Sequence, residues 1–172
     1  GILLVMILAA AASRLLPHPY NLSPIAAIAL FGGATFSTRR LAFLVPFAAL
    51  LLSDLFLKSY GGFYDQMIIV YASFALIVGI GRLVRTRRRI APLALATLTS
   101  SILFFAVTNF GVWAFGTMYP KNLAGLEACY IAAIPFFRNT LSGDLFYTVT
   151  LFGGLALLER LVPSLREPMA VA

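Results

Sequence analysis

The chain consists of long apolar stretches separated by short polar or proline-containing segments. A helix needs about 20 predominantly apolar residues to cross a bilayer, with a range of roughly 17–25. Six stretches fit or approach this length, and we expect each to be a membrane-spanning helix. They cover residues 2–16, 23–37, 41–57, 66–84, 91–113 and 139–159. The pattern therefore predicts an all-α integral membrane protein in which residues 1–172 form a single transmembrane domain of six helices.

Two apolar stretches allow a second interpretation. The sequence KNLAGLEACYIAAIPFF, residues 121–137, is interrupted by Lys121, Glu127 and Pro135. We expect a loop with a short interfacial or re-entrant helix there, because charges and a proline are unfavourable in a span, and a seventh span is the alternative. Residues 2–16 are kept as a helix, although their AAAAS end resembles a signal-peptide cleavage site.

Composition supports a membrane protein. Hydrophobic residues make up 61% of the 172 residues and charged residues 11%, and the mean hydropathy is +0.95. A soluble domain has roughly 45–50% apolar and about 25% charged residues. The single cysteine, Cys129, excludes an internal disulfide and a multi-cysteine metal site. We therefore expect neither a metal nor a cofactor.

The basic residues predict the orientation. With six spans and both termini in the cytoplasm, nine of the 13 Lys and Arg residues fall on the inner side. This excess is typical of the positive-inside rule. The run RLVRTRRR at residues 82–89 has neither interleaved aromatic residues nor a phosphate-binding glycine loop. It indicates contact with anionic lipids of the bilayer rather than with nucleic acid.

Polar and ionisable side chains, which are unfavourable inside a bilayer, converge on the outer third of the predicted bundle. Such groups usually face the bundle interior and mark functional sites. Because the inner two-thirds holds no acid or amide, the pattern predicts a cavity that opens to one side only. The residues at this depth are Arg14, His18, Asn21, Ser23, Asp54, Tyr71, Asn109, Trp113, Arg138, Asn139 and Asp144.

Structural roles remain the alternative for single members of this set. Asp54 has two candidate ion-pair partners, Arg14 and Arg138, and Asn139 is placed to cap the helix at 139–159. Aromatic residues on the outer side suit either an interfacial belt or a ligand pocket. No HExxH or GxSxG motif is present, so we do not expect an enzyme.

Small residues recur at four-residue spacing within the predicted helices. Such pairs mark places where transmembrane helices approach each other closely, and we interpret them as packing positions. The pairs are Ala29 with Gly33, Ala49 with Ser53, Ala75 with Gly79, and Ala96 with Ser100.

Four motifs carry a resemblance that extends over nearly the whole chain: LLPHPYNLSPIAAIALFGG, LLSDLFL, TNFGVWAFGTMYP and IPFFRNTLSGDLFY. They resemble a family of small bacterial membrane transport proteins that is similar to the substrate-binding S components of energy-coupling factor (ECF) vitamin transporters. The resemblance implies a six-helix bundle in the bacterial inner (cytoplasmic) membrane. It also implies an outward-facing pocket for one vitamin-like solute and docking on a shared transmembrane and ATPase module.

Within that group, the chain resembles a solitary cobalamin-specific S component. The resemblance to it implies ligand-contacting roles for His18, Asp54, Tyr71 and Arg138. The relative's cobalt-ligating cysteine has no counterpart, since Gln66 and Met67 occupy that region. An Ala-x-x-x-Ala docking pair is also missing from residues 2–16. On the strength of the resemblance we expect uptake of a small vitamin-like solute, with cobalamin as one possible substrate. A membrane assembly subunit without a substrate and a lipid-modifying membrane enzyme are the alternatives.

Overall fold

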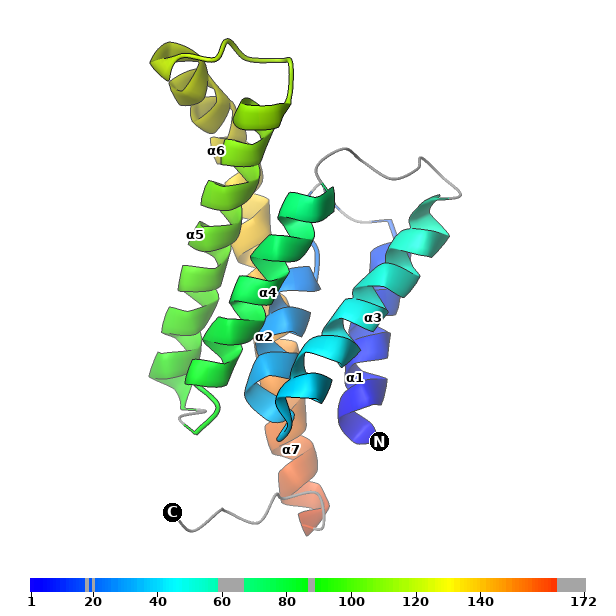
Figure 1. Ribbon diagram of the computed structural model, residues 1–172. Helices are drawn as coiled ribbons and strands as arrows, with labels where there is room; N and C mark the ends of the chain where they lie inside the picture. Colours follow the sequence, from blue (N-terminus) through cyan, green and yellow to red (C-terminus); the bar gives the residue numbers. More distant parts are fainter. Residues whose placement is uncertain (18, 20, 59–66, 87–88, 164–172) are drawn as a thin grey trace.

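Helical rods pack around one central helix (Figure 1). The computed structural model describes residues 1–17, 19, 21–58, 67–86 and 89–163, so His18 lies outside the described residues. Within them every regular element is helical, which confirms the predicted all-α class. The elements are α1 (Ile2–Ala12), η1 (Ser13–Leu15), α2 (Ile25–Thr35), α3 (Arg39–Lys58), α4 (Met67–Leu83), α5 (Ile90–Phe115), α6 (Leu123–Thr148), η2 (Val149–Gly153) and α7 (Gly154–Leu161).

The first five predicted stretches are confirmed as helices, with ends that differ by only a few residues. Local chemistry sets several of these ends. Pro24 precedes α2, where the missing N–H of proline costs no helical hydrogen bond. At the other end of α2, the Thr35 hydroxyl donates to the Phe31 carbonyl at 2.7 Å. α5 ends where Gly116 becomes extended.

The prediction for residues 121–137 is wrong. α6 begins in this segment and continues through the π-helical turn η2 into α7, so the expected loop and the sixth stretch form one helical rod, Leu123–Leu161. Lys121 precedes the rod, while Glu127 and Pro135 lie on its exposed face. These residues therefore leave the buried face unbroken. Asn139 lies within the rod and does not cap it.

Asn122 provides the N-terminal cap of α6. Its side-chain oxygen accepts a hydrogen bond from the backbone N–H of Gly125 at 2.9 Å. Replacing Asn122 with alanine is expected to cost about 0.5–2 kcal/mol, because an unpaired N–H is left at the helix start. Thermal unfolding in detergent measures the loss. Asn122→Asp keeps the acceptor and is expected to retain stability, so equal losses in both variants would contradict the cap.

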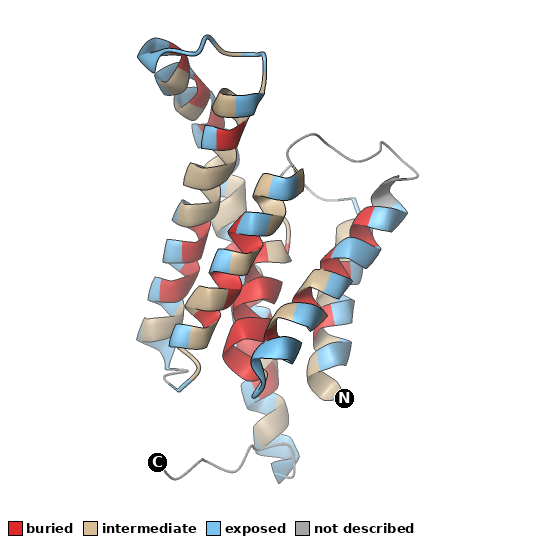
Figure 2. Cartoon of the chain, in the orientation of Figure 1, coloured by how far each residue is buried: buried red, intermediate tan, exposed pale blue. Residues whose placement is uncertain are grey.

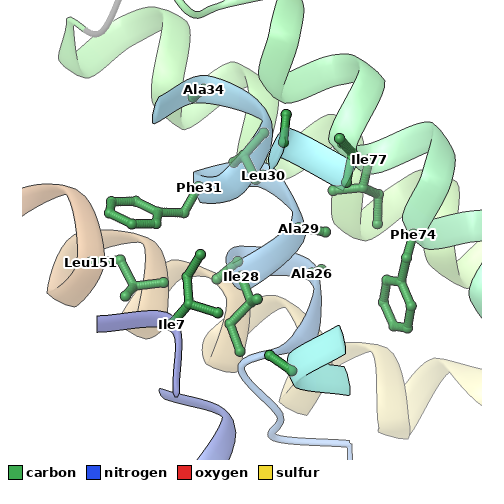
Figure 3. Close-up of a cluster of buried hydrophobic side chains, with 14 of the residues drawn as sticks. Ile7, Ala26, Ile28, Ala29, Leu30, Phe31, Ala34, Phe74, Ile77 and Leu151 are labelled. Atoms are coloured by element: carbon green, nitrogen blue, oxygen red, sulfur yellow. The ribbon is translucent and has the colours of Figure 1, made fainter. Parts of the chain in front are cut away.

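α2 is the most enclosed helix of the bundle. Every residue from Ala26 to Thr35 is buried (Figure 2). α1, α3, α4, α5 and α6 all contact it. The close-up of the core shows Phe31 of α2 beside Leu151 and Ile7, and Phe74 and Ile77 on another side of the helix (Figure 3). Its sequence IAAIALFGGAT is rich in small residues, which allows neighbours to approach from all sides.

The backbones of α2 and α4 approach each other closely where they cross, and glycine residues allow this approach. A methyl group added at Gly33 would lie 2.2 Å from the Val78 carbonyl oxygen, and one at Gly81 would lie 2.4 Å from the Leu30 carbonyl oxygen. These distances are shorter than any van der Waals contact, so only glycine permits this approach. The crossing fixes the position of α2, whose N-terminal end reaches the cavity described below.

The outer surface of the molecule is largely apolar. α5 and the rod Leu123–Leu161 are long and apolar enough to cross a membrane. Only 22% and 28% of their most apolar stretches are buried inside the molecule, so they differ from core helices of a soluble protein. Large exposed apolar surfaces mark contact with a membrane or another protein. The surface therefore favours a membrane environment.

Candidate functional site

A cavity of about 350 Å³ lies between η1, the segment before α2, and helices α2, α4, α5 and α6. Its walls are mainly apolar, with Phe74 of α4 and Phe104 of α5 as the largest side chains. A small group of polar side chains lines the same space: Arg14, Asn21, Ser23, Thr140 and Asp144. An apolar cavity with a few convergent polar groups is the usual form of a small-molecule site.

Asp144 of α6 is the most enclosed polar residue of this cavity. Its side chain is 2% exposed, and Oδ2 accepts a hydrogen bond from the Ser101 hydroxyl at 2.6 Å. Gly143 lets the segment before α2 approach α6, since a methyl group at Gly143 would lie 3.1 Å from the backbone nitrogen of Ser23. Asp144 is therefore level with the start of α2 and near the middle of the rod, rather than in its first turns as the sequence predicted.

Arg14 is held at the cavity by a buried ion pair. Its Nη1 lies 2.8 Å from Asp54 Oδ1, and it also donates to the hydroxyl of Ser53. Tyr71 donates from its hydroxyl to Asp54 Oδ2 at 2.8 Å. The first of the two partners predicted for Asp54 is thus confirmed, whereas Arg138 is exposed on α6.

The structure brings together six of the eleven polar residues predicted at this depth, Arg14 and Ser23 of the lining among them. Asn21 and Asp144 line the cavity, and Asp54 and Tyr71 support Arg14 beside it. Asn21 adopts a left-handed conformation with φ of 62°, which asparagine tolerates better than most residues. The turn that carries it precedes α2, so its shape positions Ser23 as well.

Four other predicted residues lie outside the cavity lining. Asn109 donates to the Phe105 carbonyl at 2.8 Å, and Trp113 donates to the Pro120 carbonyl at 2.9 Å. These bonds stabilise the end of α5 and its connection to α6. Arg138 and Asn139 lie on α6, exposed and partly buried respectively. The sequence predicted a loop at residues 121–137, whereas residues 123–138 form the first part of α6, so Arg138 and Asn139 lie within a long helix and outside the cavity lining.

Ser101 is a contact of the candidate site that the sequence prediction did not include. It lies four residues after Thr97, and the Ser101 hydroxyl also lies 3.1 Å from the Thr97 carbonyl oxygen. Hydroxyl residues at this spacing share one helix face. The run TLTSS at residues 97–101 was therefore a signal for a polar strip on α5 that faces the acid of α6.

The chemistry of this arrangement is that of binding. The carboxylate of Asp144, the hydroxyl groups of Ser23 and Thr140 and the paired arginine Arg14 can hold a solute by hydrogen bonds and charge. Among the described residues, no group of three His, Cys, Asp or Glu side chains lies close enough to hold a metal ion.

Comparison with known proteins gives one match. No curated protein and no solved structure is significantly similar to the chain. Residues 1–165 match DUF6580, a family of unknown function. Because the match covers nearly the whole chain, this protein belongs to the DUF6580 family.

Proposed function

We propose that this protein is a membrane-embedded binding protein that captures a small solute for uptake, in the manner of ECF S components. The observation that carries the proposal is the enclosed carboxylate of Asp144 at a mainly apolar cavity. Burying an ionisable group costs free energy unless it is paired. An ionisable group that is buried at a cavity of ligand size, roughly 300–1,000 Å³, is a candidate for ligand recognition.

The exterior of the helices supports the membrane location. Six membrane-spanning helices with both termini in the cytoplasm would place the basic residues 82–89 against the inner leaflet of the bacterial inner membrane. The cavity would then open outward. An ECF-type transmembrane and ATPase module that docks on the apolar helix faces would supply the energy for uptake.

The cavity volume bears on the substrate. A corrinoid with its nucleotide tail is far larger than a space of about 350 Å³. The volume therefore favours a compact vitamin-like solute over cobalamin. The ion pair of Arg14 and Asp54, which Tyr71 supports, would hold the polar wall of the site in place.

Filling the cavity tests the proposal. Val70 of α4 lines the cavity, whereas Ile68 of the same helix is 82% exposed. We expect Val70→Phe to abolish binding of any compound that co-purifies with the wild-type protein, and Ile68→Phe to leave binding unchanged. Mass spectrometry of the purified protein identifies the compound. Its addition at 100 times Kd is expected to stabilise the wild-type protein by about 2.7 kcal/mol.

Two results would contradict binding at this cavity. One is a compound that Val70→Phe retains as well as the wild-type protein does. The other is purified protein that holds no compound and is stabilised by none. The second result would favour an assembly subunit in which the ion pair serves only the fold. Conversion of a membrane lipid that requires Asp144 would instead favour the enzyme alternative.

A further inference from the structure

We propose that the cavity selects a solute with a single positive charge, an organic ammonium ion that carries an apolar body. This inference rests on the proposed function and names its substrate class. It depends on three features of the cavity: the balance of charge, the unused hydrogen-bond acceptors, and the aromatic wall.

The described lining holds one basic and one acidic residue, Arg14 and Asp144, and Asp54 beside the cavity adds a second acid. Arg14 and Asp54 form an ion pair at 2.8 Å, so their charges cancel beside the cavity. Asp144 is in no ion pair with any residue that the structure describes. A buried carboxylate without a cationic partner is strongly unfavourable, and a bound cation removes that penalty. A solute that is anionic would meet repulsion at the same place.

The hydrogen-bond acceptors of the site are only partly used. An ionised carboxylate accepts about four hydrogen bonds. Asp144 receives one from Ser101, whose single hydroxyl proton is also near the Thr97 carbonyl. Ser23 lines the same cavity, and its hydroxyl oxygen is buried without a hydrogen-bond partner among the described residues. An ammonium group has three N–H donors, which suit the free capacity of Asp144 and Ser23.

The aromatic wall of the cavity suits an apolar body. Phe74 and Phe104 are stacked, with ring centroids 5.6 Å apart and an interplanar angle of 15°. Both rings line the cavity, together with Val70 and Ile25. Aromatic rings attract organic cations and pack against flat or branched apolar groups. The solute would thus place its charge at Asp144 of α6 and its body against the rings of Phe74 and Phe104.

Matched probes that differ in charge test this inference. We would titrate the full chain in detergent with 2-phenylethylamine, 2-phenylethanol and phenylacetate, which share a ring and differ at the polar end. Calorimetry is expected to show at least tenfold tighter binding of the amine than of the alcohol, and no binding of the acid. The Asp144→Asn variant keeps the shape of the side chain and is expected to lose at least tenfold in amine affinity.

Glu127→Gln is the control for this variant. It removes one negative charge from the exposed face of the same helix, away from the cavity lining. We expect it to bind the amine within about twofold of the wild-type protein, since an exposed charge in water is strongly screened. Circular dichroism and thermal unfolding show whether each variant is folded.

The outcomes separate this inference from the proposed function. Equal affinity for amine and alcohol, or an amine affinity that survives Asp144→Asn, overturns the cationic class and leaves the cavity as a binding site. If none of the probes binds, the charge of the compound that co-purifies with the protein tests the cationic class. A cation that Asp144→Asn loses supports the inference, and a neutral or anionic compound overturns it. Absence of both probe binding and a co-purified compound overturns the inference and the proposed function together.

Discussion

Replacing Gly81 with alanine is expected to destabilise the protein by about 1–3 kcal/mol, because the added methyl group forces two packed helices apart. The methyl group would lie 2.4 Å from the Leu30 carbonyl oxygen and 2.9 Å from the Cα of Gly33. Both are backbone atoms, so no side chain can rotate away to make room. Unfolding in mixed detergent micelles measures the change in free energy.

Gly79 of the same helix is the matched control. A methyl group there would meet no heavy atom within 4 Å. Gly79→Ala is therefore expected to be neutral or to stabilise the helix by up to about 1 kcal/mol, because alanine has the higher helix propensity. Equal destabilisation by the two substitutions would show that the crossing of α2 and α4 does not depend on close backbone contact.

The same two glycines show what spacing in a sequence can predict. The pairs Ala29 with Gly33 and Ala75 with Gly79 correctly indicated that α2 and α4 use small residues. The second pair named the wrong glycine, since Gly81 and not Gly79 makes the contact. Spacing defines a face of one helix, whereas the crossing angle and depth of two helices depend on both surfaces together. That information is absent from either segment alone.

Helix positions were predictable where the sequence pattern is simple. Long apolar runs bounded by proline or basic residues gave five helices with nearly correct ends. The segment 121–137 failed because its proline and charges were weighed as breaks in a span. In the rod Leu123–Leu161, Pro135 and Glu127 occupy the exposed face, where a helix tolerates them. Whether an interruption matters depends on the face that carries it, and this requires the tertiary structure.

Site residues could be predicted from the sequence only where their depth in the bundle was sufficient to bring them together. Asp54 and Tyr71 meet because their helices are adjacent and antiparallel, and Arg14 reaches them from η1. Asn109 and Trp113 were placed at similar depth, yet they bond within the connection from α5 to α6. Depth alone gives no direction around the helix axis. The spacing of Thr97 and Ser101 does indicate such a direction, because hydroxyl residues four positions apart lie on one face of α5.

Replacing Asp54 with alanine is expected to cost about 3–5 kcal/mol, the largest effect among these variants, because Arg14 would be left charged without its partner. The two side chains are only 11% and 8% exposed, so water screens them poorly. Tyr71→Phe removes one hydrogen bond to the carboxylate and is expected to cost roughly 1.5–3 kcal/mol. Unfolding in mixed micelles ranks the two variants on one scale.

A double substitution separates the value of the pair from the cost of breaking it. Arg14→Met with Asp54→Leu replaces both charges by apolar side chains, and buried pairs replaced in this way often lose little stability or gain some. We therefore expect the double variant to be more stable than Asp54→Ala alone. If the double variant loses as much stability as Asp54→Ala alone, the intact pair itself stabilises the fold. If it folds well but no longer binds the co-purified compound, the ion pair is kept for the cavity, where it holds Arg14 neutralised and leaves Asp144 as the unmatched charge.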